Sequence, residues 1–227
     1  MKHYGDKIWE EIFSTQQWGK YPPEYVIRWF FWAKGQIEQA QIKALDLGCG
    51  IGACSWFMRK EGAKVTAIDG SFSALEKVND LAQSFNVNND IETIHGDITQ
   101  PLTYLTEQYD LLLDNASLYS NEENKIHDAL KDYQNIMNKN SYFLMNCFGE
   151  KSSGFGTGRQ ISNNTYSDVK GLFQNRGTVT FFTRERINEI IKELNYEIIY
   201  HSNLIENRGD LISEHLITVF KKRTLVR

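Results

Sequence analysis

The sequence is poor in the features of secreted, membrane-spanning and nucleic-acid-binding proteins. It has only three cysteines and three prolines in 227 residues, so we expect no disulfide framework, no metal site and no proline-rich hinge. No apolar run approaches the roughly 20 residues of a membrane-spanning helix, and the first residues lack the apolar core of a secretory signal. With 25 basic against 29 acidic residues there is no positive excess for a phosphate backbone. We therefore expect a cytoplasmic protein without nucleic-acid or membrane partners.

Aromatic residues are plentiful, and they crowd at one end. Four of the five tryptophans, Trp9, Trp18, Trp29 and Trp32, fall within the first 32 residues. The spacing of Trp29 and Trp32 suits a helix packed on a sheet, whereas the turn that contains Trp18 does not fit a helix. We expect one domain over residues 1–227, with residues 1–42 as a helical segment and lid.

From residue 43 onward, short apolar runs alternate with helical patterns. Strands are expected at 44–47, 64–68, 91–95, 109–113 and 142–148, and the Ser120–Glu123 spacing predicts a capping box for the helix that follows. This alternation favours a parallel sheet covered by helices on both faces in a cofactor-binding half, residues 43–148. Residues 149–182 predict a covering insertion that is irregular over residues 149–176 and ends in a strand at 178–182. A helix at 184–194 and an antiparallel strand pair complete residues 183–227.

A glycine-rich turn stands where the first of these strands ends and a helix begins. Gly48, Gly50 and Gly52 occupy alternate positions, which lets a ligand lie against the main chain. Asp69 ends the next strand, 21 residues after Gly48, and Asp97 closes the third strand. Because the carboxyl ends of parallel strands form the ligand edge of such a sheet, these residues predict a site for a nucleotide-like cofactor.

Two cofactor classes fit the glycine spacing. Gly48-x-Gly50-x-x-Ala53 also satisfies the dinucleotide fingerprint, so an NAD(P)-dependent oxidoreductase stays an alternative. The carboxylate of Asp46, two residues before the first glycine, would repel a pyrophosphate but could orient a cationic amino group. That charge favours S-adenosylmethionine.

Four segments together resemble the class I S-adenosylmethionine-dependent methyltransferases, in particular bacterial small-molecule enzymes. They are Asp46-Leu-Gly-Cys-Gly-Ile-Gly, Ala67-Ile-Asp-Gly-Ser, Gly96-Asp-Ile and the run from Tyr109 to Ser117. The resemblance implies an α/β, doubly wound, mostly parallel seven-stranded sheet with a C-terminal antiparallel pair, the Rossmann-like methyltransferase fold. It implies the cofactor S-adenosyl-L-methionine, whose product is S-adenosyl-L-homocysteine. The expected cofactor-binding residues are Trp18, Tyr21, Asp46, Gly48, Cys49, Gly50, Gly52, Asp69, Gly70, Ser71, Asp97, Ile98, Asn115 and Ala116.

The sequence gives fewer signals for the substrate that would accept the methyl group than for the cofactor. The segment after the fourth strand lacks the Asn/Asp-Pro-Pro-Tyr motif of enzymes that methylate nucleic-acid amino groups, which leaves N or O of a small polar metabolite. An activated methyl donor needs mainly proximity and orientation, and the candidates for a catalytic base are Asp114 and His95. Candidate substrate-binding residues are Tyr119, Arg159 and Tyr166. A monomer or homodimer is expected, and a non-catalytic S-adenosylmethionine-binding protein is the other alternative.

Overall fold

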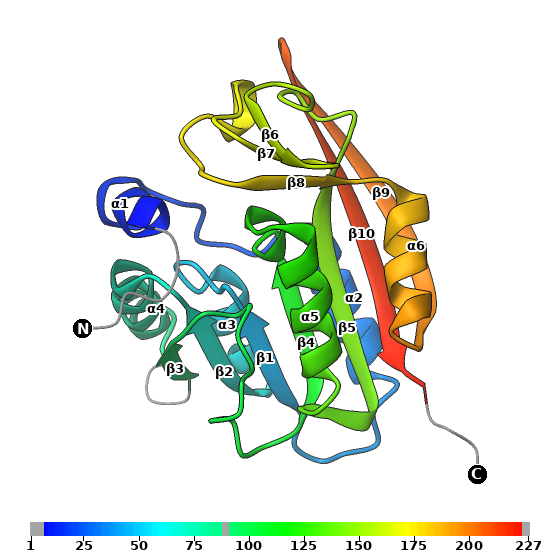
Figure 1. Ribbon diagram of the computed structural model, residues 1–227. Helices are drawn as coiled ribbons and strands as arrows, with labels where there is room; N and C mark the ends of the chain where they lie inside the picture. Colours follow the sequence, from blue (N-terminus) through cyan, green and yellow to red (C-terminus); the bar gives the residue numbers. More distant parts are fainter. Residues whose placement is uncertain (1–6, 88–90, 224–227) are drawn as a thin grey trace.

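The structure is a computed structural model that describes residues 7–87 and 91–223. The chain begins with α1 (Lys7–Thr15) and α2 (Glu24–Lys34) and continues into an alternating α/β arrangement (Figure 1). The following elements are β1 (Lys43–Leu47), α3 (Ala53–Lys60), β2 (Lys64–Asp69), α4 (Phe72–Ser84), β3 (Ile91–His95), β4 (Tyr109–Asn115), η1 (Leu118–Ser120), α5 (Glu123–Tyr133) and β5 (Met137–Gly149). The last are β6 (Arg159–Ser162), β7 (Thr165–Ser167), η2 (Gly171–Phe173), β8 (Val179–Phe182), α6 (Arg184–Glu193), β9 (Tyr196–Arg208) and β10 (Leu211–Lys222).

The main sheet has the strand order β3-β2-β1-β4-β5-β10-β9. Strands β1 to β5 run parallel to one another, and β10 is antiparallel to both β5 and β9. The order reverses between β1 and β4, as in a doubly wound fold. The expected doubly wound, mostly parallel sheet with a C-terminal antiparallel pair is therefore confirmed, and three further strands that join at the end of β5 bring the sheet to ten strands rather than seven.

Helices cover both faces of this sheet because the central strands are apolar on both faces. Leu112 of β4 packs in one core cluster with residues of α5 and α6, whereas Leu111 and Leu113 pack in the other with residues of α2 and α3. Successive side chains of a strand point to opposite faces, so one continuous apolar run supplies both cores. Figure 1 shows α5 in front of the sheet and α2 behind it.

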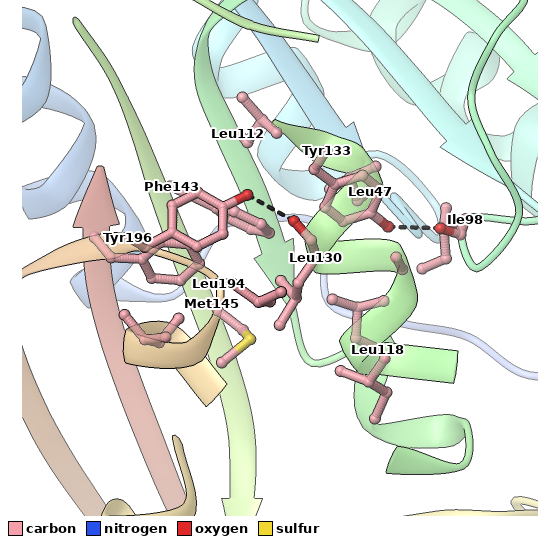
Figure 2. Packing of buried hydrophobic residues seen from close by; sticks show 14 of the residues in the cluster. Leu47, Ile98, Leu112, Leu118, Leu130, Tyr133, Phe143, Met145, Leu194 and Tyr196 are labelled. Carbon is pink, nitrogen blue, oxygen red and sulfur yellow. Dashed lines mark hydrogen bonds between the residues drawn. The ribbon is translucent and has the colours of Figure 1, made fainter. Parts of the chain in front are cut away.

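Two tyrosines satisfy polar backbone groups inside the α5–α6 cluster (Figure 2). The Tyr133 hydroxyl donates to the Ile98 carbonyl oxygen at 2.6 Å, and the Tyr196 hydroxyl donates to the Leu130 carbonyl oxygen at 2.6 Å. The first of these bonds ties α5 to the loop that follows β3. Ile98 also lines a cavity at the carboxyl ends of the parallel strands. The bond from Tyr133 therefore connects the core to the wall of that cavity.

The covering insertion is more regular than the sequence predicted. Strands β6, β7 and β8 form a small antiparallel sheet, and Phe181 and Phe182 of β8 pair with the end of β5. The prediction of an irregular stretch over residues 149–176 was therefore wrong at β6 and β7, whereas the strand expected at 178–182 is confirmed by β8. Tyr166 packs with Phe155 and Phe181 in a separate apolar cluster, which supplies the burial that this short sheet needs.

The capping box predicted for α5 is also wrong. The helix begins at Glu123, its N-cap is Glu122 without a side-chain cap, and Ser120 instead ends the short helix η1. Side-chain caps occur elsewhere: Ser71 accepts a hydrogen bond at the start of α4 and Thr183 does so at the start of α6. No helix in the described part of the chain is long and apolar enough to cross a membrane.

We expect Trp29→Ala to lower the free energy of unfolding by about 3–5 kcal/mol, because removal of a large buried ring leaves a cavity between α2 and the sheet. Trp29 is fully buried, whereas Phe31 on the same helix is 49% exposed. Phe31→Ala is therefore the matched control, with an expected loss below about 1 kcal/mol. Urea denaturation followed by circular dichroism measures both, and equal losses would contradict the packing of α2.

Candidate functional site

A cavity of about 1010 Å³ opens at the carboxyl ends of the parallel strands. Its walls come from the segment around α1, from the loops after β1, β2, β3 and β4, from β5, and from the β9–β10 hairpin. In Figure 1, α1 and the β6–β8 sheet stand over this same end of the main sheet. The cavity wall combines aromatic, acidic, glycine and amide residues, among them Trp9, Phe13, Trp18, Tyr21, Glu24, Tyr25, Asp46, Gly48, Cys49, Gly50, Asp69, Gly70, Asp97, Ile98, Asn115, Ala116, Tyr119, Ser120, Asn146, Arg176, Glu206, Arg208 and His215.

The glycine loop follows β1 and faces the cavity. Gly48 has a φ of +65°, and a Cβ there would lie 1.6 Å from the Ser117 Oγ. A Cβ on Gly50 would lie 3.2 Å from the ring of Phe13. No side chain fits at Gly48 without displacing the loop after β4, so the glycine lets the loop after β1 pack directly against Ser117 while Gly48 lines the cavity.

Gly52 has a different role from the two glycines before it. It is the N-cap of α3 in the left-handed conformation, and a Cβ there would meet Val78 of α4 at 3.0 Å. Gly52 is absent from the cavity wall. Its small size allows α3 and α4 to pack closely. Gly52 was expected to contact the cofactor, but it does not line the cavity.

Two carboxylates stand at neighbouring strand ends on the cavity wall. Asp69 accepts the Gly50 N–H at 2.8 Å and the Ser71 N–H at 2.9 Å, and Asp97 accepts both the N–H and the hydroxyl of Thr99. Burial raises the pKa of Asp69, and the two backbone N–H groups oppose that rise. A carboxylate has about four lone-pair sites, so each group keeps capacity to accept from a ligand hydroxyl or amine.

Asp46 forms the most buried acidic part of the wall. Its side chain is 2% exposed and accepts the Ser55 hydroxyl at 2.6 Å. Burial raises its pKa to about 7 despite that hydrogen bond, and the negative charge of Asp69 adds to the rise. A cation bound here would favour the ionised form of Asp46 and would itself be stabilised.

Helix α1 covers the glycine loop and is fixed by one carboxylate. Glu10 accepts the hydroxyls of Ser71 and Ser73 at 2.6 Å each, at the N-terminus of α4. On the same helix, Trp9 and Phe13 pack against Trp18, with ring centroids at 6.4 and 5.4 Å. The indole of Trp18 is thereby held on the cavity wall. Ser71, expected at the cofactor, serves this anchor and the cap of α4 and does not line the cavity.

Tyr21 lies at the outer rim and is 68% exposed. Its ring meets the edges of Trp56 and Phe85, and the Trp56 indole N–H donates to the Lys20 carbonyl oxygen at 2.7 Å. The turn between α1 and α2 is therefore fastened to α3. Of the two expected lid residues, Trp18 faces the interior and Tyr21 stands mainly in solvent.

The structure does not bring either candidate base to the cavity wall. Asp114 is fully buried and uses one carboxylate oxygen to accept the N–H groups of Ser117 and Leu118, which holds η1. His95 stacks on Phe72 at 3.6 Å between ring centroids, and its Nε2 lies 2.9 Å from the Gly70 carbonyl oxygen. Neither residue lines the cavity, so we assign no proton transfer to them.

The three expected substrate residues separate in the fold. Tyr119 lines the cavity, whereas Tyr166 packs inside the cluster of the small sheet. Arg159 lines a second hollow of about 960 Å³ between α1 and residues 167–178, and its Nε donates to the Ser167 hydroxyl at 3.2 Å. Only Tyr119 of the three is placed to contact a ligand in the cavity.

Sequence analysis missed a polar network on the far wall. The Tyr25 hydroxyl donates to the Asn115 Oδ1 at 2.6 Å and accepts from the Asn146 Nδ2 at 2.8 Å. His215 Nδ1 lies 3.1 Å from the same Asn146 nitrogen, and burial lowers the pKa of His215, which favours its neutral form at pH 7. These residues come from α2, β4, β5 and β10, so no short motif could reveal them. Arg176 is a further lining residue to which sequence analysis gave no role.

A family model described as a methyltransferase domain matches residues 38–193. Solved structures with the same fold include a 1,6-didemethyltoxoflavin-N1-methyltransferase from Burkholderia thailandensis, at 16% identity and TM-score 0.66 over 88% of this chain and 79% of that one. The CcbJ methyltransferase from Streptomyces caelestis shares 13% identity, with TM-score 0.66 over 95% and 96% of the two chains. The N-methyltransferase NodS from Bradyrhizobium japonicum shares 16% identity, with TM-score 0.61 over 88% and 87%. No curated protein sequence matches.

We expect Asp114→Asn to remain folded and to be more stable than the parent protein above neutral pH. Burial raises the pKa of Asp114 to about 7. The parent therefore loses stability as pH rises from about 4, where the unfolded carboxyl ionises, to about 7, where the folded one does. The amide oxygen of the Asp114→Asn variant still accepts the two N–H groups, and the amide does not ionise. The free energy of unfolding of the variant should therefore exceed that of the parent by about 1–4 kcal/mol at pH 8, and the two should be equal near pH 4.

Chemical denaturation at a series of pH values measures the difference between variant and parent. Asp80→Asn on the exposed face of α4 is the control and should show no comparable trend. A pH-independent difference for Asp114→Asn would contradict the buried, raised-pKa carboxyl.

Proposed function

Because this chain belongs to the family of methyltransferase domains, we propose that its cavity binds S-adenosylmethionine and transfers the methyl group to N or O of a small polar metabolite. The observation that carries the proposal is the glycine loop, open to the cavity at Gly48 and flanked by the carboxylates of Asp69 and Asp97 on the neighbouring strand ends. This arrangement offers close backbone approach beside acceptors for hydroxyl groups.

The residues present suit this cofactor. Asp69 would accept from the ribose hydroxyls, Asp97 and Ile98 would border the adenine, and Asn115 with Ala116 would face the methionine part. Cys49 fills space in the loop, and burial raises the pKa of its thiol well above the usual range. The acidic wall of Asp46, Asp69 and Asp97 favours a cation over a pyrophosphate, which argues against the NAD(P)-dependent alternative.

S-adenosylmethionine bound here would supply an activated methyl carbon to the acceptor lone pair, and the electrons of the carbon–sulfur bond would stay on sulfur. The chain's own contribution is to exclude water and to hold the acceptor in line. Tyr25, Asn146 and His215 provide neutral donors and acceptors that can orient a polar molecule. An amine needs no strong base for this step, and His215, which lines the cavity and favours its neutral form at pH 7, would be able to receive a proton from a hydroxyl.

The N-terminal segment closes the site from above in this proposal. Trp18 is held over the cavity by Trp9 and Phe13, and Glu10 holds α1 against α4. A ring in this position shields the reacting atoms from water. A cavity volume of about 1010 Å³ can hold the cofactor together with a small acceptor, which supports a metabolite over a protein substrate.

We expect Gly48→Ala to weaken S-adenosylhomocysteine binding at least about 10-fold, because a Cβ would collide with Ser117, displace a loop that lines the cavity and strain a left-handed residue. Gly35→Ala is the matched control, since Gly35 has ordinary helical angles and only a 3.4 Å contact at its would-be Cβ. Isothermal titration gives both affinities, and circular dichroism confirms folding. Binding of NAD(H) in place of S-adenosylhomocysteine would overturn the proposal.

We also expect Trp18→Ala to reduce methyl transfer strongly and Tyr21→Ala to reduce it little. The first change opens the covered wall, whereas the second removes a ring that is already 68% exposed. Turnover is measured with a panel of small amines and hydroxy compounds, and S-adenosylhomocysteine affinity is measured alongside. Equal effects of the two substitutions would sink the assignment of the lid to Trp18.

A further inference from the structure

We propose that the acceptor carries an anionic carboxylate or phosphate group and that Arg176 binds it. This inference rests on the proposed methyltransferase function and gives it a substrate class. It begins from the position of Arg176, which lies between η2 and β8 and lines both the cavity and the neighbouring hollow of about 960 Å³. The guanidinium therefore stands where a ligand in the cavity would extend toward solvent.

Arg176 is held in place by an aromatic contact and by an interaction with the Tyr119 side chain, which engages only part of its guanidinium fork. Its guanidinium carbon lies 5.4 Å from the centre of the Trp18 ring, over the indole face. A cation over an aromatic face is attracted by the ring electrons, and a guanidinium has five N–H donors, so donors beyond the contact with Tyr119 remain for a ligand. Trp18 is itself packed by Trp9 and Phe13 of α1, so the cation is positioned by an aromatic support.

The other outer charges on the cavity wall already have partners. Arg208 forms an ion pair with Glu206 at 3.0 Å, and Glu24 pairs with Arg28 at 2.8 Å. Within residues 7–87 and 91–223, no carboxylate lies within ion-pair distance of Arg176. A cation in a concave site without a counter-ion favours an anionic ligand, and an arginine fork suits carboxylate and phosphate equally.

Neutral donors accompany Arg176 on this part of the wall. The Trp18 indole N–H and the Ser120 hydroxyl are buried without a hydrogen-bond partner, and both residues line the cavity. Burial raises the pKa of Tyr119, and the positive charge of Arg176 opposes that rise, so the phenol keeps its proton beside the cation. Carboxylates and phosphates present oxygen atoms that accept hydrogen bonds. Such a group in the cavity would give these donors the acceptor that they lack.

Arg159, the arginine expected to bind the substrate, is a weaker candidate. It is exposed on β6, donates to the Ser167 hydroxyl and lines only the outer hollow. That hollow also contains Glu11 and Asp168, so its charge is mixed. A large anionic acceptor could extend past Arg176 into this hollow, but the contact nearest the cavity is with Arg176.

A binding experiment tests the anion site without an acceptor. Protein saturated with S-adenosylhomocysteine is titrated calorimetrically with inorganic phosphate and, separately, with acetate. We expect saturable binding of at least one ion, weakened about 10-fold or more by Arg176→Gln and less by Arg176→Lys. Arg28→Gln, on the exposed side of α2, is the matched control and should bind as the parent does. No saturable binding of either ion, or equal binding by parent and Arg176→Gln, would overturn the proposal.

An activity experiment tests the substrate class with matched pairs of acceptors. Each small amine or hydroxy carboxylate is assayed beside its primary amide, and each phosphate monoester beside its dephosphorylated parent, so the two anion types are distinguished. We expect methylation of the anionic member, with KM raised about 10- to 100-fold by Arg176→Gln and kcat changed less. The neutral partners should show no such dependence on Arg176.

The outcomes separate this inference from the function on which it rests. Equal turnover of charged and neutral partners would overturn the anionic acceptor. A fall in S-adenosylhomocysteine affinity that matches the rise in KM would show that Arg176 serves the cofactor, and would overturn it too. If the parent neither binds S-adenosylhomocysteine nor methylates any acceptor, the proposed function fails, while phosphate or acetate binding still reports directly on Arg176.

Discussion

The central strands β1 and β4 are buried on both faces, and this constraint decides where polar groups can stand. Leu111, Leu112 and Leu113 alternate between two cores, so the strand interiors have no place for a ligand. Polar and glycine residues gather at the carboxyl ends, at Gly48, Asp69 and Asn115 among others. The site is therefore a consequence of how the two cores are filled.

Segments distant in sequence close this strand edge into a cavity. Helix α1 is fastened to α4 through Glu10, and the small sheet is joined to β5 through β8. The start of the covering insertion is also tied to the hairpin, because the Ser153 N–H donates to the Ile212 carbonyl oxygen at 2.7 Å. These covers surround the cavity at the strand edge and are fixed to it by the contacts above.

The cavity is divided electrostatically. Asp46, Asp69 and Asp97 contribute carboxylates from β1, the end of β2 and the loop after β3. Tyr25, Asn146 and His215 form a hydrogen-bonded network elsewhere on the wall, near the ion pair of Glu206 and Arg208. Arg176 adds a positive charge beside the unpartnered indole N–H of Trp18, which supports the proposal of an anionic acceptor.

The sequence alone determined the sheet, the helices on its two faces and the glycine loop with its acidic neighbours, because these follow from local periodicity and short motifs. It misplaced the start of α5, since Ser120 is drawn into η1 where Asp114 accepts the backbone N–H groups. Only the tertiary structure decided that Asp114 supports a turn, that Gly52 serves helix packing, and that Arg176 rather than Arg159 faces the cavity. The physical reason is that burial, ion pairing and cavity position depend on contacts between residues far apart in the chain.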